Sequence, residues 1–294
     1  MNPRSLLLVA SLCLPWQMNA KSPDFMQELH AWEAEMARSG VAAARDVPED
    51  VRAILALEPS ERDEAQAALV ANYFRGLKED RVAAARKTTG EAIRKRFAEA
   101  GLPYPPREIF LRAFKREMEL ELWAREKDEP FRKVASFTVT VPSGGPGPKR
   151  REGDLQVPEG CYTIAVFNPK SRFHLSLGLN YPNDSDRILS DRERPGGEIY
   201  IHGGAKSVGC LPLGDPAIEE VYLAALDTRE RGQSEIPVHI FPARMSGEAW
   251  KTVAREKPEF RAFWEELQPI YKAFEKTRRV PVVSVESDGC YRLR

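Results

Sequence analysis

A histidine and a cysteine stand eight residues apart in the segment IYIHGGAKSVGCLPLGD, residues 199–215. Acyl transfer by a cysteine needs a thiolate, a base that takes the thiol proton, and hydrogen-bond donors for the oxyanion. A free thiol has a pKa of about 8.5 and an imidazole one of about 6.5, so a neighbouring histidine shifts the balance towards the thiolate. His202 and Cys210 therefore indicate nucleophilic catalysis by cysteine, although a coincidental pair in a core would have the same spacing.

The residues around the cysteine decide whether the pair can meet and bind a carbonyl. Gly203, Gly204 and Gly209 tolerate positive φ, so the chain can fold back between the two side chains. Gly209 also leaves room for a substrate carbonyl at the backbone N–H groups beside Cys210. A helix is predicted after the cysteine with Asp215 as its N-cap, and the helix dipole would stabilise developing negative charge.

The spacing of apolar residues changes along the chain that must position this pair. Residues 21–104 have helical spacing and end in the proline-rich segment GLPYPP, which predicts an all-α N-terminal region. From residue 105 onwards, alternating runs such as Met118, Leu120 and Leu122 predict strands. The segment PEFRAFWEELQPIYKAFEKTRR predicts an amphipathic helix near the end of the chain, interrupted at Pro269. The predicted fold class is α+β, with a mostly-β domain at residues 105–294 that carries helical decorations.

The N-terminal residues predict export. Residues 1–20 contain Arg4, an apolar run from Leu6 to Trp16 and a polar stretch ending at Ala20, which is the layout of a signal peptide. We therefore expect a protein of the periplasm or cell envelope; the alternatives are a frayed apolar terminus and a lipoprotein attached through Cys13. No later segment is long and apolar enough for a stable membrane span. The basic and acidic residues number 44 each, which gives no indication of nucleic-acid binding.

The histidine and cysteine belong to a longer series of sequence motifs. In chain order, these are GPKRREGDLQVPEGCYTI, FHLSLGLNYPNDSDR, PGGEIYIHG, SVGC, HIFPARM and FWEELQPIYKAFEKTR, all within residues 108–294. Together they resemble the L,D-transpeptidase (YkuD) catalytic domain family, and the short spacing from histidine to cysteine is similar to its YafK-like branch. The resemblance implies an L,D-transpeptidase-like fold for the mostly-β domain.

The resemblance also implies a substrate and roles for the site residues. Family members act on peptidoglycan stem peptides: the cysteine attacks the carbonyl at the L-centre of a diamino acid, the following D-residue leaves, and a thioester forms. An amine acceptor then gives a cross-link or anchors a protein, whereas water gives hydrolysis. On this chain Cys210 matches the nucleophile and His202 the general base, while Gly203, Ser207 and Gly209 match motif positions around the oxyanion pocket.

Three positions depart from the usual pattern of the family. Val208 stands where many members have a second histidine, and Pro212 where many have an arginine. The short-spacing branch often lacks both, so these departures weaken the inference about substrate more than the inference about catalysis. Ala205 replaces a cysteine of that branch, which removes one redox partner near the nucleophile.

Other polar side chains are weaker candidates for binding substrate. Lys149 and Arg172 could contact carboxylates of a stem peptide, and His174 belongs to a branch motif on a predicted strand. Surface charges and a hydrogen-bonded structural histidine are the simpler interpretations, and His239 is also better explained as structural. A metal site joining these histidines to Cys210 would lack short ligand pairs, so we expect no metal and no cofactor.

The favoured function is cysteine-dependent acyl transfer on peptidoglycan stem peptides, in cross-linking or remodelling of the cell wall. One alternative is an L,D-endopeptidase or amidase that releases peptides or a peptidoglycan-anchored envelope protein. The other is a non-catalytic envelope-binding module, against which the intact His202 and Cys210 pair argues. Cys161 and Cys290 match no catalytic position, and two free thiols are a simpler interpretation than a disulfide between them.

Overall fold

The computed structural model describes residues 80–140, 143–205 and 207–294, together with residues 53, 54, 56, 57, 61 and 66. The signal peptide predicted for residues 1–20 and most of the helical region predicted for residues 21–104 lie outside the described residues. In the part of the chain that is described, no helix is long and apolar enough to cross a membrane.

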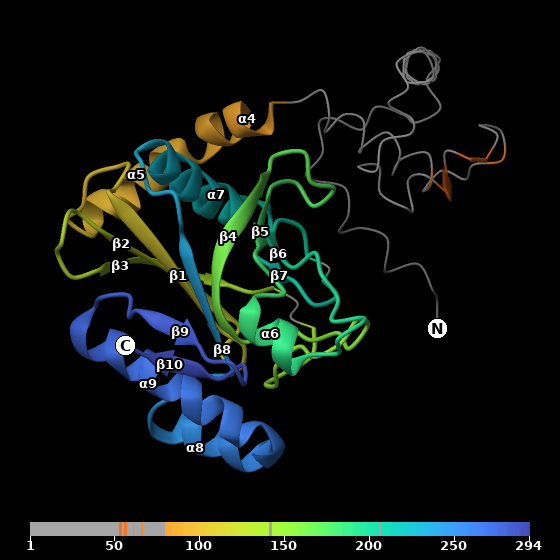
Figure 1. The fold of residues 1–294 in the computed structure, drawn as a ribbon. Helices are drawn as coiled ribbons and strands as arrows, with labels where there is room; N and C mark the ends of the chain where they lie inside the picture. The colour runs from red at the N-terminus through yellow and green to blue at the C-terminus, as the bar shows by residue number, and fades with distance from the viewer. Residues whose placement is uncertain are drawn as a thin grey trace, which may run out of the picture. The chain divides into compact units, whose positions relative to one another are not determined.

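A mixed sheet of eight strands, in the order β3-β2-β1-β8-β4-β5-β6-β7, forms the centre of the described part of the chain (Figure 1). Adjacent strands in the sheet are antiparallel, except for the parallel pairs β1 with β8 and β6 with β7. The strands are β1 (Glu108–Phe114), β2 (Glu119–Arg125), β3 (Arg132–Thr138), β4 (Gly160–Asn168), β5 (Ser176–Leu179), β6 (Tyr200–His202), β7 (Leu211–Pro212) and β8 (Pro237–Phe241).

One face of the sheet is covered by α4 (Arg81–Thr88), α5 (Gly90–Glu99) and α7 (Asp215–Glu230) (Figure 1). Alternate residues of β1, Ile109 and Leu111, point into this layer and pack in one cluster with Phe97 of α5 and Val221 of α7. The period of two in a strand and the spacing of 3.6 in a helix bring these apolar side chains to one shared face. A short helix, α6 (Asp184–Leu189), follows β5.

The opposite face is covered by α9 (Arg261–Thr277), together with α8 (Gly247–Glu256) and the 3-10 turn η3 (Pro258–Phe260). Here the other alternate residues of β1, Phe110 and Phe114, pack against Phe274 and Tyr271 of α9. The predicted amphipathic helix is confirmed, but the predicted interruption is wrong, because the helix continues through Pro269. A separate two-stranded hairpin of β9 (Val283–Val285) and β10 (Tyr291–Leu293) completes the chain.

The predicted α+β class is confirmed, with a large mixed sheet and helices on both of its faces. The compact unit that contains the sheet runs from Glu79 to Arg294, so it begins before the boundary predicted at residues 104 and 105. It begins earlier because α4 and α5 pack against α7 and α5 also packs against β3. The division into a helical region and a catalytic domain near residue 105 stays a prediction.

Candidate active site

The segment that bears the histidine and the cysteine folds back within one parallel strand pair. β6 and β7 pair with Ile201 opposite Leu211, so continuing the register by one residue brings Cys210 beside Tyr200. Two glycines make this tight return possible. A Cβ at Gly203 would lie 2.6 Å from the Phe173 carbonyl oxygen, and Gly209 has φ of +89°.

The thiol of Cys210 lies against the backbone that leads into β6. The Tyr200 N–H donates to Sγ at 3.4 Å, and the Sγ–H reaches the Glu198 carbonyl oxygen at 3.6 Å. Burial raises the pKa of the Cys210 thiol, and the Tyr200 N–H lowers it in part. The Glu198 charge raises the pKa further, whereas the charges of Arg172 and Lys149 lower it. Because the raising effects win, the thiol is protonated at neutral pH.

The imidazole of His202 is held in one orientation by its own loop. Its Nδ1 hydrogen-bonds the Gly203 carbonyl oxygen at 2.5 Å, and the Phe173 ring packs at 4.6 Å between ring centroids. A carbonyl only accepts, so Nδ1 carries the proton, and Nε2 of the neutral ring is the nitrogen that can accept one. Burial lowers the pKa of His202, and the Arg172 charge lowers it further. The ring is therefore neutral at neutral pH.

His202 and Cys210 are close in the sheet but are not hydrogen-bonded to each other among the contacts of the described residues. They stand two positions out of register on neighbouring strands, on the order of 7 Å apart along the strand direction. Catalytic hydrogen bonds are often long in the absence of substrate and tighten when it binds. The arrangement fits a neutral thiol and a neutral base that meet only during reaction.

The backbone N–H groups expected to bind an oxyanion are occupied by serine hydroxyls. The Cys210 N–H donates to Ser207 Oγ at 2.8 Å, and Ser207 Oγ donates in turn to the Cys210 carbonyl oxygen at 2.9 Å. The Gly209 N–H donates to Ser143 Oγ. The Gly203 N–H donates to the Leu175 carbonyl oxygen at 3.1 Å. A substrate oxygen would have to replace one of the two serine hydroxyls.

The helix after the cysteine begins differently from the prediction. Gly214 with φ of +77° is the N-cap, and Asp215 is the first residue of α7, so the predicted cap at Asp215 is wrong by one position. The Asp215 side chain is used elsewhere, because its Oδ1 accepts from the Gly204 N–H at 2.8 Å and ties the loop to the helix. A contribution of the helix dipole to the thiol stays a prediction.

A hydrogen-bonded chain of residues connects α4 and α5 to the loop that faces His202. His174 Nε2 contacts Glu219 Oε1 at 2.8 Å, and the same carboxylate group accepts from Thr88 and Thr89. Arg81 of α4 donates to the Ser171 carbonyl oxygen and, at 2.6 Å, to the His174 carbonyl oxygen. His174 is thus tied to Glu219 here, and its predicted contact with substrate stays a prediction.

The two cations predicted to bind substrate both precede the thiol segment in the chain, and their surroundings differ. Lys149 is buried, and its Nζ donates to Asp154 Oδ1 and to the Arg151 carbonyl oxygen, each at 2.8 Å. Arg172 is exposed, and its guanidinium lies 4.8 Å from the centre of the Phe173 ring that contacts His202. Lys149 thus ties residues of its own loop together, and contact of either cation with substrate stays a prediction.

Backbone strain gathers around this segment. Among the non-glycine residues with positive φ, Leu155 at +60°, His174 at +71° and Glu198 at +55° all belong to the loops around Cys210. Left-handed backbone in side-chain-bearing residues costs free energy and is concentrated at functional sites. Gln156, next to Leu155, places its carbonyl oxygen 3.2 Å from where a Cβ of Gly209 would lie.

Several residues of the site could not be identified from the sequence. Ser143 lies in a Gly/Pro-rich loop with no motif, and Phe173 is an ordinary apolar residue before a strand. Tyr200 acts through its backbone N–H, which every residue except proline has. Glu198 offered a weak signal, since it is an acidic residue between two glycines and the strand of the histidine.

Three further residues with a histidine or thiol side chain, His239, Cys161 and Cys290, belong to other elements of the described part of the chain. His239 is buried on β8 with its ring 4.8 Å from the Phe110 ring centre, and burial lowers its pKa to about 3. Cys161 and Cys290 are free thiols in the structure. Across the residues that are described, no group of three or more His, Cys, Asp or Glu side chains could hold a metal ion.

Comparison with known proteins identifies relatives of the chain. No protein-family model matches it. It is 33% identical over 179 residues to "Putative L,D-transpeptidase YafK" of Escherichia coli (strain K12), which covers 60% of this chain and 70% of that protein. The protein of the same name from Escherichia coli O157:H7 gives the same values.

Two solved structures are also similar in part. The helical cell shape determining protein Pgp2 from Campylobacter jejuni is 17% identical, with a TM-score of 0.38, over 61% of this chain and 73% of that one. Bd1075 from Bdellovibrio bacteriovorus is 20% identical, with a TM-score of 0.35, over 57% of this chain and 62% of that one. From its identity to the Escherichia coli proteins over most of their length, the chain belongs to the L,D-transpeptidase family, in the YafK-like branch.

Proposed function

We propose that this protein is an acyl transferase that acts on peptidoglycan stem peptides through a thioester on Cys210. The observation that carries the proposal is the position of the Cys210 thiol, held by the backbone that leads into the strand of His202. Membership of the L,D-transpeptidase family supports the choice of an L-centre carbonyl as the point of attack. Such a substrate lies in the cell envelope, where we therefore expect the protein.

In the first step, His202 acts as a general base. Nε2 takes the thiol proton while Sγ forms a bond to the substrate carbonyl carbon, so the thiolate need not exist beforehand. We infer that proton transfer accompanies the attack because burial raises the pKa of Cys210 and lowers the pKa of His202, so both groups are neutral before the reaction. The carbonyl oxygen becomes negative and takes the place of a serine hydroxyl at the N–H of Cys210 or Gly209.

In the second step, the carbon–nitrogen bond of the substrate breaks. The protonated His202 gives its proton to the departing amine, and the acyl group stays on Sγ as a thioester. An acceptor amine then attacks the thioester carbonyl and gives a proton to His202, the carbon–sulfur bond breaks, and His202 returns the proton to Sγ. Water in place of the amine would give hydrolysis by the same residues, so the acceptor decides between transfer and release.

The test is incubation of the purified protein with isolated peptidoglycan, followed by separation of the muropeptides and intact-mass measurement of the protein. Acyl transfer predicts new cross-links between diamino acid residues, and hydrolysis predicts shortened stems. Both predict an acyl adduct on Cys210, which a carbapenem should also form. An unmodified protein and unchanged muropeptides would contradict the proposal and favour a binding module.

Two cysteine variants make this test specific. Cys210→Ala should abolish the adduct and all change in the muropeptides. Cys290→Ala is the matched control, because it removes another free thiol that lies next to the β10 strand. It should leave both signals at the wild-type level.

A further inference from the structure

A pocket of about 490 Å³ opens beside the proposed nucleophile. Its lining includes Glu198, whose carbonyl oxygen lies 3.6 Å from Cys210 Sγ, and Val208, two residues before the cysteine and 72% exposed. The other charged lining residues are Lys149, Glu152, Glu193 and Arg194. Cys210 does not itself line the pocket, but residues that contact or flank it do, so the pocket borders the thiol segment.

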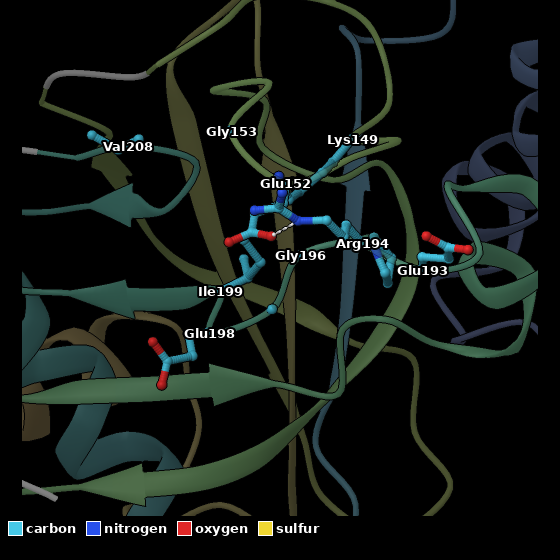
Figure 2. Close-up of a pocket in the computed structure, with 11 residues that line it drawn as sticks. Lys149, Glu152, Gly153, Glu193, Arg194, Gly196, Glu198, Ile199 and Val208 are labelled. Carbon is cyan, nitrogen blue, oxygen red and sulfur yellow. Dashed lines mark hydrogen bonds and ion pairs between the residues drawn. The ribbon is translucent and has the colours of Figure 1, made fainter. Parts of the chain in front are cut away.

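The charges of the pocket do not cancel. The Lys149 ammonium is paired with Asp154, and the Arg194 guanidinium is paired with Glu152 at 2.8 Å, as the dashed line in Figure 2 shows. Within the described part of the chain, the side-chain carboxylates of Glu193 and Glu198 have no hydrogen bond or ion pair, and Figure 2 shows both apart from the Arg194 pair. The charge left over is negative, so the complementary ligand group is a cation.

Of these two carboxylates, Glu198 is the one that acts on the thiol. Its charge raises the pKa of Cys210 and, after burial, that of Tyr200. The free protein thus holds a negative charge where it opposes formation of the thiolate. The backbone of Glu198 is also in the left-handed region, at φ of +55°. This conformation costs free energy that a glycine would avoid.

A bound cation would remove the repulsion between the Glu198 carboxylate and a thiolate at Cys210. An ammonium group next to the Glu198 carboxylate would neutralise the charge near Sγ, and the sulfur would then become a better nucleophile only when substrate is present. The acyl donor of the proposed reaction is attacked at a diamino acid residue, which has a second amino group.

We propose that Glu198 is a specificity residue that binds a free ammonium group on the acyl donor, at the residue whose carbonyl Cys210 attacks. This inference rests on the proposed function. It goes beyond that function because it assigns the pocket beside the thiol to a charged group of the donor. A donor whose second amino group is acylated or absent would bind this pocket less well.

The test compares two synthetic stem-peptide donors that differ only in the second amino group, free in one and acetylated in the other. Formation of the acyl-enzyme is followed by intact mass. For the wild type we expect kcat/KM about 5- to 10-fold higher with the free amine, as for a partly exposed charged hydrogen bond. Glu198→Gln should bring the ratio close to one. The matched control Glu91→Gln, at an exposed position of α5 outside the pocket, should keep the wild-type ratio.

A second measurement separates recognition from a merely structural role. Alkylation of Cys210 by iodoacetamide at about pH 8 reports the thiolate without any donor. Glu198→Gln should raise this rate about 2-fold, because the charge that raises the thiol pKa is gone, while its kcat/KM for the free-amine donor falls. A variant in which both rates fall together, or which keeps its preference for the free amine, would overturn the inference.

The outcomes also distinguish this inference from the proposed function. If neither donor acylates the wild type, the proposed acyl transfer is wrong. If both donors acylate it equally well, acyl transfer stands and only the role of Glu198 is wrong.

Discussion

Two groups of charges in this protein differ in how completely they are paired. Arg112 on β1 is buried, and its guanidinium donates to Glu121 at 2.7 Å and to Glu275 at 2.8 Å. The Cζ atom of the guanidinium lies 4.5 Å from the centre of the Phe274 ring. Glu121 also accepts from Trp123 Nε1 at 2.8 Å. Around Cys210, in contrast, the Glu198 carboxylate is exposed and lacks a partner among the described residues.

The difference separates structural charges from charges that are available for a ligand. A buried ion has lost its hydration shell. It is tolerated only when hydrogen bonds and opposite charges of the protein replace the lost water, as at Arg112. An exposed charge keeps its hydration and can exchange it for a substrate. The ion pairs of α4 and α5 lie between the two groups. The Asp227 and Glu220 carboxylates on α7 are buried, whereas their partners Arg86 and Arg96 are partly exposed.

The largest expected effect is that of removing α4 and α5. A shortened chain that begins at Arg107 loses the buried side chains of Ile93, Phe97 and Leu102, each contributing about 1.5–3 kcal/mol. The sum is comparable with the whole stability of a typical domain, so we expect aggregation or a cooperative unfolding transition at much lower temperature. Expression and thermal unfolding of chains beginning at Glu79 and at Arg107 test this.

The chain beginning at Glu79 is the control, because it keeps every contact between α4, α5 and α7. A soluble chain from Arg107 with unchanged acylation of Cys210 would show that the catalytic domain starts near residue 105, as the sequence predicts.

The second effect concerns His202, which belongs to the less completely paired region around Cys210. His202→Gln should lower kcat/KM by about 10²–10⁴-fold, since it removes the base while keeping much of the side-chain volume. In the wild type the neutral imidazole is the active form of the base, and burial lowers its pKa. The kcat/KM should therefore rise with pH as His202 loses its proton, and this rise should lie below about pH 6.5. The pH profile of kcat/KM in both proteins measures this rise, which the variant should lack.

Alkylation by iodoacetamide provides the contrast in the same pH series. Burial raises the pKa of Cys210, so the alkylation rate should still be rising above about pH 8.5. An alkylation rate that is already constant between about pH 6 and 8 would mean a preformed thiolate–imidazolium pair, and the general-base step would then be wrong.

The smallest of the three effects is that of Arg112→Met. The substitution removes the buried cation that pairs with Glu121, but Arg244 still contacts Glu121 at 3.0 Å. The free energy of unfolding should therefore fall by about 3 kcal/mol, the low end for a broken buried ion pair. The rate of Cys210 acylation in the remaining folded protein should not change, because Arg112 lies in the core at β1. Denaturant unfolding and acylation kinetics measure the two quantities.

Arg194→Met is the matched control at the pocket, where the same substitution breaks an exposed pair with Glu152. It should leave the unfolding midpoint unchanged. Equal losses of stability in the two variants would show that burial and pairing do not separate the two groups of charges.

Much of the fold was accessible from local sequence patterns. The alternation in MELEL predicts β2 from Glu119 onwards, and the apolar spacing around Trp264 and Leu267 predicts α9, because both patterns depend only on neighbours in the chain. The place of Glu121 was not accessible. It lies on the polar side of β2, yet α9 covers that side and makes the residue buried, through contacts more than 100 residues away.

The sequence by itself determined the kinds of element, the glycines that let β6 and β7 return so tightly, and the motifs that resemble one family. These depend on residue type and on spacing within a few turns or strands. Only the tertiary structure decided that Tyr200 N–H contacts the thiol, that Ser143 occupies the Gly209 N–H, and that Glu219 takes His174. Such contacts depend on which distant segments become neighbours, and that choice is made by burial of the whole apolar surface and not by any local pattern.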